Sequence, residues 1–171
     1  MRTPKPNNQL SSLLSQEENL NFYKTISKTA GAGEKRELLV NKGPMRLLER
    51  LLPNRPIQLH NKYEYPAYRT LDHRGEVFTF YLRRGLADLM MRDRGIYMPK
   101  GYVVKLWNDD DVYDLQWSNL KITAAGPRRA RNSFMTHYLI ELRLTALLAG
   151  MCPDEFMQSI IAANIGGATN D

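Results

Sequence analysis

The stretch YPAYRTLDHRGEVFTFYL, residues 65–82, decides the fold of the middle of this chain. Its two halves are rich in aromatic and β-branched residues, which favour strands. Between them, Asp72-His73-Arg74-Gly75 has the composition of a turn, with a glycine where the backbone needs a positive φ. We therefore predict a β-hairpin with strands over 65–71 and 76–82.

Working outward toward the C-terminus, the pattern alternates between helix and strand. A short helix follows the hairpin, with Leu86, Leu89 and Met90 on one side, and Gly95 ends it. Two further strands are predicted over 102–107 and 120–123, joined by a loop rich in Asn and Asp. A long helix is predicted over about 133–148.

The last segment, 144–161, has the spacing of a helix-turn-helix, with Ala146 between the helices and Gly150 in the turn. Pro153 would open the second helix, and Cys152 is expected to be a small buried residue. The acidic pair Asp154 and Glu155 stands where residues that read DNA would lie. A plain helical hairpin is therefore the alternative interpretation.

Toward the N-terminus, helices are predicted instead of strands. Residues 1–16 are rich in Pro, Asn, Gln and Ser and are expected to form a flexible tail. We predict one helix capped by Ser15 and running to about residue 26, a second over 34–42, and a third that begins at Pro44. The fold class is therefore α+β, with N-terminal helices, a small β-hairpin, a ββα unit and a C-terminal helical hairpin.

The composition excludes several classes of protein. No apolar run approaches the ~20 residues that span a bilayer, and no apolar stretch follows the N-terminal charges, so we expect neither a membrane protein nor a secreted one. The single cysteine excludes a disulfide framework and a cysteine-rich zinc site within one chain. We expect a cytoplasmic protein.

The charge of the chain is basic, with 24 Lys and Arg against 18 Asp and Glu and a net charge of +6. Arginine, whose planar fork suits phosphate, supplies 15 of the cations, and residues 1–64 carry 11 basic against 6 acidic residues. Nucleic acid is the first partner that such a balance indicates. A basic charge kept only for solubility is the alternative.

Residues 65–132 resemble the HNH homing-endonuclease domain of bacteriophages, in the subfamily related to plant ethylene-response DNA-binding domains. The resemblance is carried by the hairpin around Gly75, by the turn Met98-Pro99-Lys100-Gly101 and by Asp114-Leu115-Gln116-Trp117-Ser118-Asn119-Leu120-Lys121-Ile122-Thr123. The family writes the last stretch as Asp-Leu-Arg-x-x-Asn-Leu followed by apolar-x-Thr. On this basis the chain divides into the tail, a helical region over 17–60, an HNH-like DNA-binding domain over 61–132 and C-terminal helices over 133–171.

The resemblance implies roles for individual residues. Asp114, Asn119 and Leu120 form the structural motif, in which the Asn fixes a loop through backbone groups. In the plant domains a three-stranded sheet enters the major groove of DNA and exposed arginines read the bases. The residues expected to contact DNA here are Arg69, Arg74, Arg83, Arg84, Lys105, Arg128, Arg129 and Arg131.

The chain departs from the HNH pattern at the catalytic position. HNH nucleases carry a histidine general base at the end of the first strand of the motif, whereas Lys105 or Leu106 stands there in this chain. A lysine of ordinary pKa, about 10.4, is protonated near neutral pH and cannot accept a proton. His60, His73 and His137 lie in other segments. We therefore predict no catalytic residue.

Two further groups of residues have both a functional and a structural interpretation. Asp109, Asp110 and Asp111 could hold Mg²⁺ or Ca²⁺, but runs of Asn and Asp are also ordinary loop chemistry, and we predict no metal and no cofactor. Trp107 and Trp117 could stack on bases, but we expect them to fill the small core.

The sequence thus favours a DNA-binding protein of a phage or mobile element, acting in the bacterial host cell, that regulates or recruits without cutting. Double-stranded DNA is the expected partner, and a host or phage protein is a further one. The alternatives are a nicking endonuclease with a substituted base and an inhibitor or adaptor that binds a host complex. The sequence leaves the oligomeric state open.

Overall fold

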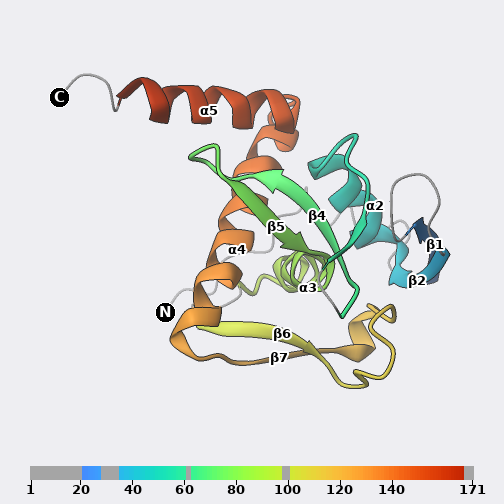
Figure 1. Ribbon diagram of the computed structural model, residues 1–171. Helices are drawn as coiled ribbons and strands as arrows, with labels where there is room; N and C mark the ends of the chain where they lie inside the picture. The colour runs from blue at the N-terminus through green and yellow to red at the C-terminus, as the bar shows by residue number, and fades with distance from the viewer. Residues whose placement is uncertain (1–20, 28–34, 61–62, 98–100, 168–171) are drawn as a thin grey trace.

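The computed structural model describes residues 21–27, 35–60, 63–97 and 101–167, and the side chains of all of these except 21–27, 35 and 127–133. The described residues form an α+β fold with four α-helices and three small antiparallel sheets (Figure 1). The helices are α2 (Lys42–Leu51), α3 (Leu82–Asp93), α4 (Pro127–Leu148) and α5 (Pro153–Gly167). The α+β class predicted from the sequence is therefore confirmed.

The largest sheet has three strands in the order β3-β4-β5. The strands are β3 (Gln58–His60), β4 (Tyr65–Leu71) and β5 (Val77–Tyr81). The predicted hairpin is confirmed: β4 pairs antiparallel with β5, with Arg69 opposite Thr79. Gly75 has a φ of +84° in the connecting turn, a conformation that a side chain disfavours.

Two separate hairpins complete the sheet structure. Strand β6 (Tyr102–Leu106) pairs with β7 (Leu120–Ala124), as predicted, and Lys105 lies opposite Lys121. Strand β1 (Asn21–Ser27) pairs with β2 (Lys35–Asn41). A short 3-10 turn, η1 (Trp117–Asn119), leads into β7.

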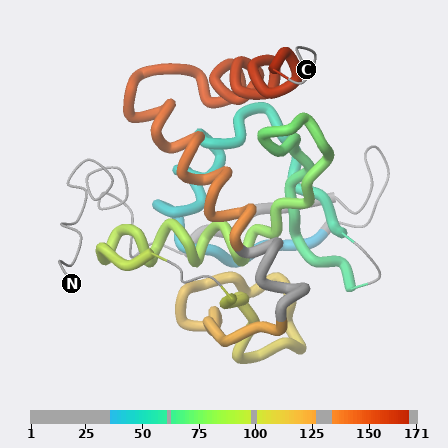
Figure 2. The backbone as a smooth tube through the Cα atoms, turned by 90° about the vertical axis from the view of Figure 1, so that its left-hand side faces the viewer, coloured from blue at the N-terminus to red at the C-terminus, as the bar shows by residue number. Residues whose placement is uncertain are grey.

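The core lies where α2, α3 and α4 meet, between the three-stranded sheet and the β6–β7 hairpin (Figures 1 and 2). Leu48 of α2, Leu86 of α3 and Leu139 of α4 are at most 1% exposed. Tyr68 and Phe80 of the sheet are buried with them. Both sheets are therefore packed against the same group of helices.

Gly85 shows how closely α3 approaches the sheet. A Cβ atom at this position would lie 2.5 Å from Cε1 of Phe80 and 3.3 Å from Cδ2 of Leu48. Both neighbours are core side chains that have little room to move. The glycine inside a helix is thus explained by the close packing of α3 against β5.

The N-terminal region corrects the prediction made from the sequence. Helices expected up to residue 26 and over 34–42 are strands β1 and β2 in the structure. The reason is a distant backbone partner: Leu39 N–H donates to Tyr113 O at 3.0 Å, and Leu115 N–H donates to Leu39 O at 2.9 Å. The third predicted helix is confirmed as α2, although it begins at Lys42. The expected tail over 1–16, with its capping Ser15, lies outside the described residues.

The C-terminal helix pair is confirmed, with Gly150 at a φ of +75° in the connection and Pro153 as the first residue of α5. Two details differ from the prediction. Helix α4 begins at Pro127, so Arg128, Arg129 and Arg131 belong to its first turns and not to a preceding loop. Cys152 is exposed, because it lies in the connection between the helices and not in their interface.

A buried arginine holds this helix pair to the rest of the fold. Arg143 of α4 is 2% exposed, and its Nη1 donates to Asp154 Oδ1 at 2.7 Å and to Leu51 O at 2.8 Å. Its Nη2 donates to Thr70 Oγ1 at 3.1 Å. Arg143 therefore joins α4 to α5, to the end of α2 and to β4. Among the helices of the described residues, none combines the length and apolar character that a membrane crossing requires.

Candidate nucleic-acid interface

The outer face of the three-stranded sheet is the first part of the candidate site. Strand alternation and the β4–β5 register put Arg69 and Thr79 side by side on this face, next to Leu71 and Val77. Arg69 is exposed, and so are Leu71 at 40% and Val77 at 63%. The sheet lies in front of α3 and α4 in Figure 1 and turns this face away from them. One arginine and two apolar side chains are therefore open to solvent on a flat surface.

The charged side chains of the turn between β4 and β5 pair with one another. Asp72 Oδ1 accepts hydrogen bonds from the backbone N–H groups of Arg74 at 2.8 Å and Glu76 at 3.0 Å. Arg74 in turn forms ion pairs with Asp72 at 3.2 Å and with Glu76 at 3.1 Å. Burial raises the pKa of the Asp72 carboxyl, but these hydrogen bonds and the Arg74 guanidinium outweigh burial and hold the pKa below its usual value. The charge of Arg74 is thus already balanced by two acids.

Two adjacent arginines stand on tyrosine rings where β5 runs into α3. The guanidinium carbon of Arg83 lies 4.3 Å from the ring centroid of Tyr65 and 5.6 Å from that of Tyr81. The guanidinium carbon of Arg84 lies 5.5 Å from the Tyr81 centroid, and Arg84 is only 7% exposed. These contacts are cation–π interactions, which hold a guanidinium in place without neutralising it.

The β6–β7 hairpin contributes a second pair of cations. Lys105 is exposed and lies opposite Lys121, whose Nζ is 4.2 Å from the ring centroid of Trp107. Trp107 is 65% exposed, so the prediction that it fills the core is wrong: it follows the last residue of β6 and its ring is covered on one side by Lys121. Trp117 is partly buried against the core, with Arg94 over its ring at 4.6 Å.

The loop that joins β6 to β7 is organised by Asn119. Its Oδ1 accepts from Asn108 N–H at 2.8 Å, and its Nδ2 donates to Asp114 O at 2.9 Å and to Asn108 O at 3.3 Å. Asp114 Oδ1 accepts from Gln116 N–H at 3.2 Å, and Leu120 is buried. The three residues of the sequence motif thus shape the loop and anchor the start of β7, away from solvent.

The three consecutive aspartates of this loop are exposed, and some of its polar side chains make turn contacts. Asn108 Oδ1 accepts from Asp110 N–H at 3.2 Å, and Asp111 Oδ1 accepts from Tyr113 N–H at 3.0 Å. Within the described part of the chain, no group of three or more His, Cys, Asp or Glu side chains has the arrangement of a metal site.

None of the three histidines is part of β6. His60 contacts the ring of Tyr81, and His73 contacts the ring of Tyr138, both edge-on. His137 of α4 has its Nδ1 2.7 Å from Oδ2 of the buried Asp88 on α3. Arg92 joins the same group, because its Nε donates to Asp88 and its Nη2 donates to His137 O at 3.2 Å. This network ties α3 to α4.

Reasoning from the sequence found most of these cations but not the tyrosines. Arg69, Arg83, Arg84 and Lys105 lie on or beside the two neighbouring free faces, whereas Arg74 is taken up by its turn. The side chains of Arg128, Arg129 and Arg131 lie outside the described residues. The tyrosines of the site could have been noticed in the sequence, because residues 63, 65 and 81 lie close to basic residues.

Comparison of the chain with family models, with curated proteins and with solved structures gives no match.

Proposed function

We propose that this protein binds double-stranded DNA through the outer face of β3-β4-β5 and the adjoining β6–β7 hairpin. The observation that carries the proposal is the distribution of unbalanced positive charge. Arg69, Arg83, Lys105 and Lys121 make no ion pair within the described residues. Arg69 lies on the outer face of the sheet, Arg83 and Lys105 line one pocket, and Lys121 lies opposite Lys105.

The contrast with other cations supports this choice of surface. Arg55 pairs with Asp154, Arg74 with Asp72 and Glu76, and Arg92 with Asp88 and Glu141. A cation that is already paired with an acid contributes little to the free energy of DNA binding. A cation without such a partner contributes more, because its contact with a phosphate releases the counterions of DNA. A surface that carries cations without acidic partners is therefore one that a polyanion would prefer.

The shape of the sheet suits a groove. The major groove of DNA admits a ribbon of strands, and arginine is the side chain most often bound to guanine there. Arg69 is flanked by Leu71 and Val77, whose apolar surfaces suit thymine methyl groups. The resemblance of residues 65–132 to phage HNH domains and their plant relatives supports the same use of the sheet.

We propose further that the protein binds without cutting. The strand that carries the general base in HNH nucleases holds Lys105 and Leu106 here, and Leu106 is 9% exposed in the core. Supercoiled plasmid incubated with the protein and Mg²⁺ should stay supercoiled. Nicking that disappears in the His137→Ala variant would instead assign catalysis to the pair formed by His137 and Asp88.

Binding is tested with two matched arginines of the hairpin. Arg69→Ala should weaken binding to a blunt duplex about five-fold or more, the effect of removing one interaction with a base or a phosphate. Arg74→Ala is the control, because its charge is balanced within the turn, and it should change affinity little. Equal losses of affinity in the two variants would contradict the assignment of this face.

A further inference from the structure

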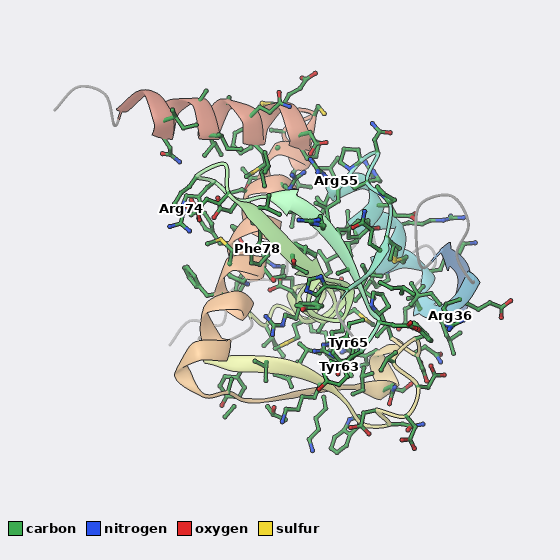
Figure 3. All side chains as sticks on the ribbon, in the orientation of Figure 1. Arg36, Arg55, Tyr63, Tyr65, Arg74 and Phe78 are labelled. Atoms are coloured by element: carbon green, nitrogen blue, oxygen red, sulfur yellow. The ribbon has the colours of Figure 1, made fainter. Side chains whose placement is uncertain are left out.

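A pocket opens where the three-stranded sheet meets the β6–β7 hairpin. It has a volume of about 520 Å³ and lies between the tyrosines of the sheet, the start of α3 and residues 103–106 of β6. Figure 3 shows Tyr63 and Tyr65 side by side in the space between β4 and β6. The polar side chains that line it are Tyr63, Tyr65, Tyr81, Arg83, Arg84, Lys105 and Asp109.

One wall of the pocket is aromatic. The rings of Tyr63 and Tyr65 are stacked, with centroids 5.7 Å apart and an interplanar angle of 30°, and Tyr81 meets Tyr65 edge-on at 6.3 Å. Tyr63 lines the pocket and is 55% exposed, so its side chain can be reached from solvent. Unpaired bases stack on such rings because each base presents a flat π-face.

The lining beside these rings is cationic, and Arg83 stands over the ring of Tyr65. Arg83 makes no ion pair in the described part of the chain, and its Nε is buried there without a hydrogen-bond partner. Arg83 and Arg84 also occupy the first turn of α3, which contains no acid. Cations are unfavourable at a helix N-terminus, where the macrodipole favours negative charge. Asp109 is the single acid of the lining, so a bound anion would offset an excess of positive charge.

We propose that this pocket holds one unpaired nucleotide of a DNA strand, with its base on Tyr63 and its phosphate beside Arg83. The shared chemistry is an aromatic base that carries a phosphate. The volume falls within the ~300–1,000 Å³ of small-ligand pockets, which suits a single nucleotide. A strand end or overhang fits the site, and the inference rests on the proposed binding of DNA by the neighbouring sheet.

The test compares three duplexes of the same sequence by fluorescence anisotropy of a dye on the far end. One duplex is blunt, one carries a short single-stranded overhang, and one carries an abasic overhang with the same phosphates. The overhang with bases should bind about ten-fold more tightly than the abasic overhang, as expected for stacking of a base on an aromatic ring. Tyr63→Ala and Arg83→Ala should remove this difference, and Tyr63→Phe should keep it.

Two variants outside the pocket serve as controls. Tyr102→Ala removes another exposed tyrosine, and Arg94→Ala removes another arginine that stacks on an aromatic ring. Both should keep the preference for the overhang with bases. Loss of the preference in these variants as well would contradict the assignment to this pocket.

The outcomes separate this inference from the proposed function. Equal affinity for the two overhangs, together with salt-sensitive binding of the blunt duplex, would overturn the pocket and leave DNA binding intact. Base-dependent binding of the overhang without binding of the blunt duplex would support the pocket and overturn groove binding by the sheet. A free mononucleotide that binds as tightly as the overhang would overturn the assignment to a strand end.

Discussion

Lys105 of β6 lies directly opposite Lys121 of β7, so two positive side chains share one face of a two-stranded hairpin. Like charges in directly opposite positions destabilise a strand pair. Neither lysine has an acidic partner among the described residues, and Lys121 is held by the ring of Trp107 instead. The pair is a cost to folding that binding of a polyanion would offset.

The lysine pair leads to the first prediction, which separates stability from binding. Lys105→Thr should raise the free energy of unfolding by about 0.5 kcal/mol, because it removes the repulsion and places a good strand former on an exposed position. The same variant should bind duplex DNA more weakly. Urea unfolding and gel-shift titration of one preparation measure both effects. A less stable variant would contradict the repulsion between Lys105 and Lys121, and a variant that binds DNA as tightly as the wild type would contradict a role of Lys105 in binding.

The second prediction concerns the loop between β6 and β7. Asn119→Ala should destabilise the protein by roughly 1–3 kcal/mol, because the part-buried hydrogen bonds of its amide to the backbone groups of Asn108 and Asp114 are lost. Asn108→Ala is the control, since its side chain accepts one exposed hydrogen bond. Thermal melts of both variants check the prediction, and similar melting temperatures would show that the Asn119 hydrogen bonds contribute little.

The third prediction tests the packing of α3 against the sheet. Gly85→Ala should destabilise the fold by about 1–3 kcal/mol, although alanine is the better helix former, because its Cβ would press on the ring of Phe80. Gly167→Ala, at the open end of α5, has no atom within 4 Å of the new Cβ and should leave stability unchanged or slightly higher. Stabilisation by Gly85→Ala would mean that the two elements are less tightly packed.

The sequence predicts the hairpins and the later helices because their signals are local. The turn residues around Gly75 and the apolar face of α2 each lie within one short stretch. Strand β2 has no such local signal, since its identity depends on hydrogen bonds between Leu39 and residues more than seventy positions away. Leu38 and Val40 are fully buried and alternate with the half-buried Leu39, as in a strand. This alternating run is too short to be distinguished from a helix by its apolar pattern alone.

The candidate site is predictable only in part for a related reason. The basic residues can be found by counting charge, but whether an acid balances each one depends on the fold. Arg74 and Arg69 look alike in the sequence, yet only Arg74 is held by Asp72 and Glu76. The pocket also joins Tyr63, Arg83 and Lys105 from three separate elements, and no local pattern brings these together.

The fourth prediction is a pH dependence that arises from the β4–β5 turn. The pKa of Asp72 is lowered on folding from its ordinary value of 3.8, so its carboxylate stabilises the fold above that value. This stabilisation disappears as the pH falls from about 4 through the folded-state pKa. Asp72→Asn should therefore lower stability at neutral pH and flatten the loss of stability below about pH 4.

The matched control for Asp72 is Glu76→Gln, because the Glu76 side chain is 69% exposed and, among the described residues, pairs only with Arg74. Urea midpoints measured from neutral pH to about pH 2 should follow the wild type in this variant. If the acid limb of Asp72→Asn stays as steep as that of the wild type, another carboxyl group controls the acid unfolding.

The central claim is that unbalanced cations on the outer sheet face and the β6–β7 hairpin bind the phosphates of double-stranded DNA. The most direct measurement is the affinity for a blunt random-sequence duplex over a salt series from about 50 to 200 mM, for the wild type and for Arg69→Ala/Lys105→Ala. For the wild type we expect a steep linear fall of log affinity with log salt, and for the variant a slope that is shallower by about 0.9 for each phosphate that it no longer binds. A flat response in the wild type, or an unchanged slope in the variant, would contradict the central claim.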